Sequence, residues 1–472
     1  MTQEQTASQP VRAAALICEY NPFHNGHAAQ LAMLRRAYPD AAILCIQSGS
    51  FVQRGDAAIF PAPLRAHAAL LHGADAVFSL PAAYSLASAE RFACAGVESA
   101  AHLGAEVLAF GAETPQLDRL CTVSERLHSD AFEAALQKSL RQSPSLGYPA
   151  RRSAVYAALY GTQDLPVLTA PNNILAFEYL RAAKMHGIAA IALPRVGAAH
   201  DAPAKEAPPQ SDICSATALR DAIHKGGALF GAPPDCIALY KDALARGRDA
   251  SLARGCAAIL YALSCADEKT LQGISDMPPD MVPRLRAAAA KSDSLPQFFA
   301  AAAHRKYTAA RVRRISLCAV LGISDAMAHA PVPYLNLLGA TPRGIAYLHA
   351  QGHLFSVPVL TKQAHIRRLD AKAQQQYAVT AHAERLYRLM QSTPSPEPVN
   401  TPTPTVGLGL DDAPIAEDVP LEADDLTAIT DDVLAFVDGQ YAFDVYAQTV
   451  ASGDSAAKTA CRACAHKSPG HS

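Results

Sequence analysis

Short apolar runs alternate with longer amphipathic stretches through the first half of the chain. The apolar runs predict buried strands at Ala14–Cys18, Ala42–Ile46, Asp75–Leu80, Glu106–Phe110 and Ile188–Leu193. Helices are expected between them, at His27–Tyr38, Leu64–His72, Ser88–Leu103 and Asn172–His186, and a further helix opens at Ser215. Gly73 and Gly104 stand where a left-handed residue would end two of these helices. The alternation predicts an α/β fold with a doubly wound parallel sheet.

The pattern changes after about residue 250, where helical periods rich in Ala, Leu and Arg continue to about residue 390. The predicted boundaries are 1–240 for the α/β domain, 241–390 for a mainly helical region, 391–432 for a flexible insertion and 433–472 for a C-terminal tail. The insertion is Pro/Thr-rich and then acidic. It cannot bury enough apolar surface to offset the entropy lost on ordering.

Composition excludes several classes of protein. Of the 472 residues, 50% are hydrophobic and 18% are charged, which is unlike a disordered or fibrous chain. The net charge of -2 excludes nucleic-acid binding through a strongly basic global field but leaves a local basic patch open. No apolar run is long enough for a membrane span and no leader segment is visible, while the eleven cysteines are mostly scattered singly. A cytoplasmic protein is therefore expected.

The clearest chemical signal lies between the first predicted strand and the first helix, at Ile17-Cys18-Glu19-Tyr20-Asn21-Pro22-Phe23-His24-Asn25-Gly26-His27. Gly26 allows a flat base to approach the backbone, and the helix that follows offers free N–H groups to phosphates. His24 and His27 can then hydrogen-bond an α-phosphate as charge develops during nucleotidyl transfer. The alternative is two surface histidines in a strand-to-helix loop. The flanking residues favour a nucleotide site.

The run Cys18–His27 resembles the opening motif of the tRNA(Met) cytidine acetate ligases, a branch of the HIGH-type nucleotidyltransferase superfamily. Further matches in order and spacing lie at 48–55, 73–75, 80–81, 88–90, 110–113, 171–175, 194–197 and 215–220, with a weaker one at 306–323. One departure is Ser79, where an acidic residue is expected before Leu80-Pro81.

The resemblance implies a nucleotidyltransferase-type ATP-binding domain and an ATP-dependent tRNA(Met) cytidine acetate ligase. Such an enzyme activates acetate as acetyl-adenylate and transfers the acetyl group to N4 of the wobble cytidine of elongator tRNA(Met). ATP with Mg²⁺, acetate and elongator tRNA(Met) are the expected cofactors and partners. No membrane is expected, and no protein partner can be inferred.

The resemblance also implies residue roles. His24 and His27 are the expected catalytic pair. The ATP site would comprise Ile17, Cys18, Glu19, Tyr20, Asn21, Pro22, Phe23, His24, Asn25, Gly26, His27, Ala28, Ala29, Gln30, Gly111, Asn172, Asn173 and Arg195. Ser215, Thr217 and Arg220 would hold phosphates, although Ser215 is equally typical of an ordinary N-cap. Cys18 is expected to be a small apolar residue that carries no acetyl group.

Two more segments carry candidate chemistry, a basic run and a cysteine pair. Lys306, Arg311, Arg313 and Arg314 belong to the densest basic run, which suits tRNA phosphates or a solvated helix face. Near the C-terminus, Cys461, Cys464 and His466 are too few ligands for a structural zinc, so no metal is predicted.

Two other functions stay open. An adenylyltransferase acting on a small phosphorylated acceptor would explain His24, His27 and the helix at 215–220, but not the long helical half. A non-catalytic RNA-binding protein with a nucleotide fold would not need the histidine motif intact. Acetate-dependent ATP–pyrophosphate exchange separates the three hypotheses.

Overall fold

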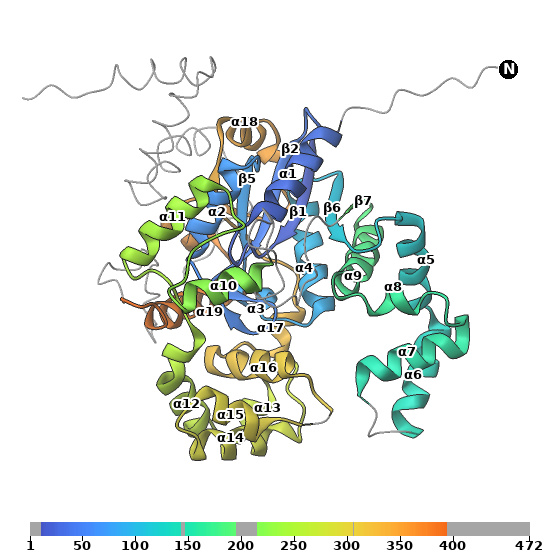
Figure 1. Cartoon of the computed structure of the whole chain (residues 1–472), viewed down its shortest axis with the longest axis vertical. Coiled ribbons are helices and arrows are strands. Elements are labelled where there is room, and N and C mark those ends of the chain that lie inside the picture. The colour runs from blue at the N-terminus through green and yellow to red at the C-terminus, as the bar shows by residue number, and fades with distance from the viewer. Residues whose placement is uncertain (1–10, 143–146, 195–214, 305, 394–472) are drawn as a thin grey trace, which may run out of the picture.

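The computed structural model describes residues 11–142, 147–194, 215–304 and 306–393 (Figure 1). A seven-stranded sheet in the order β7-β6-β1-β2-β5-β8-β9 forms its centre. The strands are β1 (Ala13–Cys18), β2 (Ala42–Ser48), β5 (Ala76–Leu80), β6 (Val107–Ala112), β7 (Ala189–Pro194), β8 (Leu335–Ala340) and β9 (Val359–Leu360). A separate two-stranded ribbon pairs β3 (Phe51–Val52) with β4 (Asp56–Ala57).

Strand order reverses beside β1. The chain passes from β1 to β2 and β5 on one side, then returns to β6 and β7 on the other, and all four pairings among these five strands are parallel. In such sheets the crevice at the carboxyl ends of the strands where the order reverses is the usual ligand site. The loop after β1 therefore lies at the position that the fold favours for a ligand.

Helices cover both faces of the sheet. α1 (Asn25–Ala37), α2 (Ala62–Leu71), α10 (Ala216–His224) and α11 (Pro234–Ala245) share one apolar core with Ala14 and Leu16 of β1. α4 (Ala89–His102), α5 (Leu117–Leu127) and α9 (Pro171–His186) share the other with Ala13 and Ala15. Alternate residues of β1 thus enter opposite cores, as period-two side chains of a doubly covered strand must. The doubly wound α/β prediction is confirmed.

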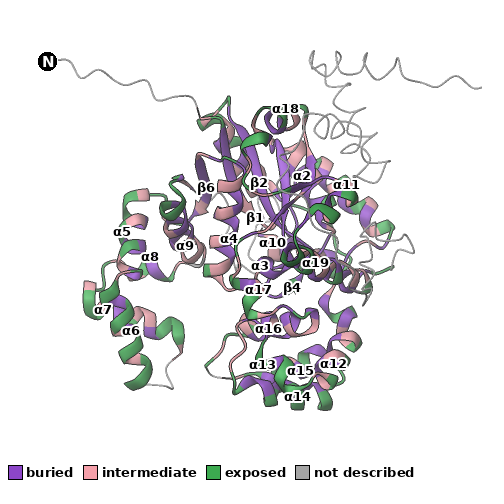
Figure 2. Cartoon of the chain, turned by 180° about the vertical axis from the view of Figure 1, so that it is seen from behind, coloured by how far each residue is buried: buried purple, intermediate pink, exposed green. Residues whose placement is uncertain are grey.

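The second half of the chain adds a helical layer with its own core. Its helices are α12 (Cys256–Cys265), α13 (Glu268–Gln272), α14 (Met281–Lys291), α15 (Leu295–Ala302), α16 (Ala309–Leu321) and α17 (Asp325–His329). Their buried sides pack with α19 (Ala371–Leu389), β3 and the short α3 (Ala82–Ser85), and Figure 2 shows buried residues on their inward surfaces. The remaining helices are α6 (Asp130–Gln142), α7 (Tyr148–Tyr160), α8 (Leu165–Thr169) and α18 (Pro342–Gln351).

The second half is mainly helical, as expected, but it also contributes two strands to the sheet. β8 pairs antiparallel with β5, and β9 pairs parallel with β8. β8 and β9 therefore extend the sheet, because the open edge of β5 leaves backbone groups that need partners. The boundary near residue 240 between the α/β domain and the helical region stays a prediction.

The other elements agree with the sequence analysis. Each predicted strand and helix is present with ends shifted by a few residues, and Ser215 is the N-cap of α10. Gly73 and Gly104 have φ of 108° and 72°, as expected of residues that end a helix. Among the described residues, no helix is both long and apolar enough to cross a membrane.

Asp75, directly before β5, ties three elements together. Its carboxylate accepts hydrogen bonds from Ile43 N at 2.8 Å and from the Arg35 guanidinium, while its carbonyl accepts one from Thr341 N at 2.8 Å. Gly344, in the first turn of α18, packs so closely that an added Cβ would overlap the Asp75 carbonyl. This contact holds the returning segment on the sheet.

Gly344→Ala should therefore destabilise the protein by about 1–3 kcal/mol, because overpacking against backbone cannot relax by a side-chain rotation. Urea unfolding measures the loss. Gly273→Ala is the matched control, since its Cβ would lie 3.6 Å from the Thr270 carbonyl oxygen, an ordinary contact. Equal stability of the two variants would show that α18 can shift freely against β5.

Candidate active site

The motif loop leaves β1 at Cys18, and α1 begins at Asn25. Within it, Tyr20 has a φ of 45°, a left-handed conformation that costs a non-glycine residue of order 1–3 kcal/mol. Tyr20 is buried, and its ring packs edge-on against Phe23 and His27, with centroids 5.0 and 4.9 Å away. This burial holds the strained residue in place and fixes where the loop turns toward α1.

His24 and His27 form a stacked pair at the start of α1. Their ring centroids are 3.7 Å apart, Nδ1 of His24 accepts from Gly26 N at 3.1 Å, and Nδ1 of His27 accepts from His24 N at 3.3 Å. Because each Nδ1 accepts a backbone hydrogen, the hydrogen bonding assigns the proton of each neutral ring to Nε2. Two Nε2–H donors beside a helix N-terminus suit the anionic oxygens of a phosphate.

Segments much later in the chain support the motif backbone. The hydroxyl of Tyr240, in α11, donates to the Phe23 carbonyl at 2.8 Å, and Asn25 N donates to the Gly231 carbonyl at 2.9 Å. The predicted residues 28–30 continue into α1 and are partly exposed. The two histidines are therefore mounted on a rigid turn.

A buried arginine that the sequence analysis missed organises the neighbouring loops. Arg65, in α2, is 0% exposed and donates to the carbonyls of Phe60 at 2.9 Å and Ser48 at 3.1 Å, and also to those of Glu19 and Gly49. Its five N–H donors in a planar fork allow one side chain to satisfy carbonyls from several segments. The loops after β1 and β2 are thereby held at a fixed separation. No sequence motif marks Arg65, since its partners are backbone oxygens.

Glu19 lies near three arginines, Arg65, Arg220 and Arg54. Its carboxylate accepts from Gln53 N at 2.6 Å, which attaches the β3–β4 ribbon to the motif. Burial raises the pKa of the Glu19 carboxyl, and that hydrogen bond together with Arg65, Arg220 and Arg54 opposes the shift. Positive charge from separate elements is thus gathered around one loop.

The start of α10 lies against the same loop. Arg220 donates from Nη1 to the Asn21 carbonyl at 2.6 Å and from Nη2 to Thr217 Oγ1 at 3.0 Å. Ser215 Oγ accepts from Ala218 N at 3.1 Å, an ordinary N-cap. The helix start that carries the predicted phosphate-binding residues therefore lies against the motif loop. These residues are Ser215, Thr217 and Arg220. Burial lowers the pKa of the Arg220 guanidinium, with Asp56 and Glu19 opposing that shift.

Ile17 and Cys18 close the inner end of the motif. Ile17 packs on α4 at Gly96, where an added Cβ would lie 2.7 Å from its Cδ1. Burial raises the pKa of the Cys18 thiol well above its usual range, and the neighbouring Cys45 adds to this. A thiol held protonated is a poor nucleophile, which agrees with the expectation that Cys18 carries no acetyl group.

Of the predicted residues in β6 and α9, Gly111 lies beside β1, and Asn172 and Asn173 contact the loop after β6. Leu16 is level with Ala109, so Gly111 is two residues further, at the level of the end of β1. Asn172 donates to the Glu113 carboxylate through its backbone N and its side chain. Asn173 is buried, and its amide already bonds the Glu113 N, Thr114 Oγ1 and Val167 carbonyl at 3.1–3.2 Å. Asn173 therefore anchors the loop after β6, a role that needs no nucleotide.

The basic run of the helical region divides in two. Arg311 donates to Asp276 Oδ1 at 2.6 Å and lies over the Tyr307 ring, with its guanidinium carbon 4.9 Å from the centroid. Arg314 is buried and pairs with the other Asp276 oxygen at 3.4 Å. These two arginines hold the start of α16 to the loop before α14.

Lys306 is exposed and Arg313 is partly exposed, and neither is paired with Asp276 in the structure. Arg313 Nε donates to the Arg54 carbonyl at 3.2 Å, and Gly55 beside it packs directly on α16, where a Cβ would lie 2.6 Å from Arg314 N. Exposed Lys306 reaches Asp280 at 3.9 Å. The β3–β4 ribbon, fixed to Glu19 at one end, thus connects the basic run to the motif loop.

A carboxylate from the far end of the chain lies near Ser79. A Cβ built on Gly49 would be 3.5 Å from Ser79 Oγ and 4.0 Å from Glu384 Oε1, so both side chains face the loop after β2. Burial raises the pKa of the Glu384 carboxyl, and Ser50 and Arg65 oppose the shift. α19 therefore supplies an acid beside the position where the sequence analysis expected one.

Several predicted residues lie outside the described part of the chain. Arg195 follows directly after the last described residue of β7, Pro194. Outside the described residues are also Cys461, Cys464 and His466, and the acidic insertion from residue 394 onward.

Comparisons with known proteins give a consistent family. The family model described as HIGH Nucleotidyl Transferase matches residues 11–401. A tRNA(Met) cytidine acetate ligase of Syntrophotalea carbinolica is 32% identical over 379 residues, covering 75% of this chain and 86% of the relative. One of Listeria monocytogenes serotype 4b is 30% identical over 359 residues, covering 74% and 89%. The chain belongs to the tRNA(Met) cytidine acetate ligase family.

A solved structure has the same fold as this cytidine acetate ligase family member. TmcAL of Thermotoga maritima bound with alpha-thio ATP superposes with a TM-score of 0.73 at 22% identity, covering 81% of this chain and 95% of that one. The likeness extends well past residue 240, which agrees with the shared sheet formed by both halves of the chain.

Arg65→Lys tests the loop arrangement in this family member. Lysine keeps the charge but cannot reach four carbonyls, so we expect stability to fall by about 1–3 kcal/mol for each buried oxygen left without a donor. ATP affinity should fall with it, because the motif loop loses its support. Urea unfolding and equilibrium nucleotide binding measure the two effects, with exposed Arg36→Lys as the control. Wild-type values for both quantities would remove Arg65 from this role.

Proposed function

We propose that this chain activates acetate with ATP and transfers the acetyl group to N4 of the wobble cytidine of elongator tRNA(Met). The observation that carries the proposal is the stacked pair His24 and His27, placed at the N-terminus of α1 where strand order reverses. Family membership supports the substrates.

In the first step an acetate oxygen attacks the α-phosphorus of ATP and pyrophosphate leaves. Charge develops on the non-bridging oxygens, where fixed donors stabilise the transition state more than the ground state. His24 and His27 offer Nε2–H groups for this, and Arg220 with the α10 start offers a cation for the remaining phosphates. Arg195 stays a predicted contributor.

In the second step the exocyclic amine of cytidine attacks the acetyl carbonyl, the bond to AMP breaks, and the amine loses a proton. Acetate alone is a poor acyl donor because oxide would have to leave, whereas AMP departs readily. No protein nucleophile is needed. The raised pKa of the Cys18 thiol supports this route over a covalent acyl-enzyme.

Mg²⁺ belongs to the proposal as the ion that accompanies the ATP phosphates. Magnesium is usually held by one or two carboxylates together with substrate phosphates. Glu19, Asp56 and Asp221 are the carboxylates whose charges act on Arg220, and they are the residues that would hold such an ion. Its chemistry there would be charge neutralisation.

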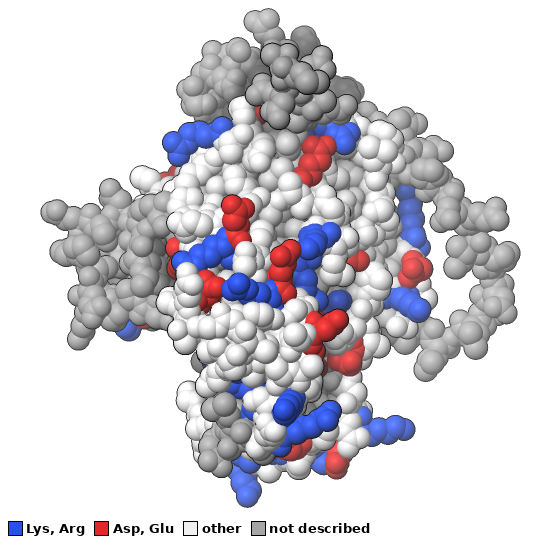
Figure 3. Space-filling model, turned by 90° about the vertical axis from the view of Figure 1, so that its right-hand side faces the viewer, with Lys and Arg blue, Asp and Glu red and all other residues white. Residues whose placement is uncertain are grey.

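The tRNA surface is proposed to include Arg313 and Lys306, with Arg54 on the adjoining ribbon. Arg311 and Arg314 are committed to Asp276 and contribute through the fold. Figure 3 shows basic and acidic side chains mixed over the middle of another face and a mainly basic lower end, the side of α6 and α7.

The two alternative functions make different demands. An adenylyltransferase for a small phosphorylated acceptor would show no acetate-dependent exchange of pyrophosphate into ATP. A non-catalytic RNA-binding protein would show no exchange with any acid. We expect acetate-dependent exchange, followed by acetylation of tRNA(Met) detected by mass analysis of its nucleosides. Cytoplasmic location remains a prediction.

His27→Ala should lower acetate-dependent exchange by about two to three orders of magnitude, the usual cost of losing one donor of this kind. ATP affinity should change far less, because the contact strengthens only as charge develops. Steady-state exchange and equilibrium ATP binding separate the two effects. Exchange within about twofold of the wild type would exclude His27 from the mechanism.

Arg313→Ala should leave acetate-dependent exchange unchanged and weaken transfer to tRNA. Loss of one phosphate contact should also reduce the slope of log affinity against log salt by about 0.7–0.9. Filter binding at several salt concentrations measures the slope. Arg36→Ala, near the opposite end of α1 from the motif, is the control. Loss of both half-reactions would assign Arg313 to folding.

A further inference from the structure

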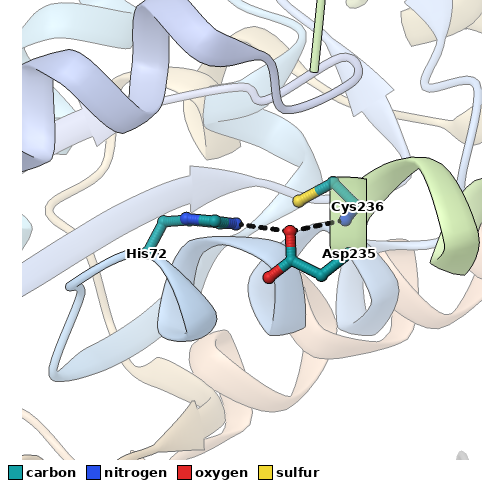
Figure 4. Close-up of side chains that lie close together, drawn as sticks. All are labelled: His72, Asp235 and Cys236. Carbon is teal, nitrogen blue, oxygen red and sulfur yellow. Dashed lines mark hydrogen bonds and ion pairs between the residues drawn. The ribbon is translucent and has the colours of Figure 1, made fainter. Parts of the chain in front are cut away.

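Three potential metal ligands meet where the end of α2 lies beside the start of α11 (Figure 4). His72 is the C-cap residue of α2, and Asp235 and Cys236 are in the first turn of α11. Their ligand atoms all lie within 4.8 Å of one another, and His72 Nε2 is 3.0 Å from Asp235 Oδ1. Within the described ranges, no other group of His, Cys, Asp and Glu meets this spacing.

We propose that His72, Asp235 and Cys236 bind a divalent ion of the zinc class. Imidazole nitrogen, thiolate and carboxylate oxygen are the donor types that zinc takes, at about 2.0–2.3 Å, which places neighbouring ligand atoms about 3–4 Å apart. The observed separations therefore need only small side-chain adjustments. A soft thiolate ligand disfavours magnesium and calcium, which select oxygen.

The surroundings of the cluster suit ion entry and retention. The Asp235 side chain is 40% exposed and that of His72 is 21% exposed, whereas Cys236 is fully buried. The closed structural site considered for Cys461 and Cys464 needs four protein ligands, whereas this would be an open site of three protein ligands. Solvent reaches its carboxylate, and water would take the fourth position.

The ion would brace the motif without touching substrate. The His72 ring stacks on Phe23 with centroids 5.3 Å apart and planes at 18°, and Phe23 lies 5.6 Å from the His27 ring. Tyr240, on the same helix as Cys236, bonds the Phe23 carbonyl. Joining α2 to α11 would therefore clamp Phe23 between two fixed elements. These are positioning residues, and the inference does not depend on the reaction proposed above.

The test is a titration of the metal-free full chain with Co²⁺, whose bond to a thiolate gives an intense near-ultraviolet charge-transfer band. The background variant is Cys461→Ser/Cys464→Ser, which removes the two cysteines that lie three positions apart near the C-terminus. We expect one equivalent of Co²⁺ to give the band and Zn²⁺ to displace it. Cys236→Ala should abolish the band, and Cys318→Ser, which replaces another buried cysteine, should retain it.

A second measurement covers variants that fold poorly. Zn²⁺ should raise the unfolding temperature of the background protein, because an ion that binds only the folded state stabilises it, and should do so much less in Asp235→Asn. Absence of the thiolate band in the background protein, or its persistence in Cys236→Ala, would overturn the metal site. His72 and Asp235 would then form a simple hydrogen-bonded pair.

Discussion

The edge of the sheet that carries the histidine motif depends on one buried cation, Arg65. The loops after β1 and β2 must run irregularly to leave space for a ligand, and an irregular buried backbone has carbonyl oxygens without ladder partners. Arg65 donates to four of them from a fully buried position. The same guanidinium compensates the charge of Glu19. The loop that presents His24 and His27 can therefore be irregular and rigid together.

Around that centre, each contact to the motif comes from a different part of the chain. Tyr240 and Gly231 hold its second half, and Arg220 holds the Asn21 carbonyl. The β3–β4 ribbon joins Glu19 to α16, so that the helical region is connected to the motif loop. A proposed second substrate as large as tRNA would thus be positioned by the same elements that position the histidines.

The sequence alone predicted the features that depend on local order. Short apolar runs alternating with helical stretches predicted the five parallel strands and their connecting helices, because a strand covered on both faces needs apolar side chains at nearly every position. The motif at 17–27 was recognisable since its chemistry is contiguous in the chain. Ser215 was predictable as an N-cap for the same reason.

Tertiary structure decided what depends on partners distant in the chain. β8 joined the sheet because β5 had an open edge, and the short apolar run at 335–340 does not by itself say which strand it pairs with. Arg314 belongs to the fold and not to the exposed basic run because Asp276 lies beside it. The Asn173 amide hydrogen-bonds the loop after β6 and the Val167 carbonyl. A side chain's type is fixed by sequence, but its hydrogen-bond partners and its burial are properties of three-dimensional neighbours.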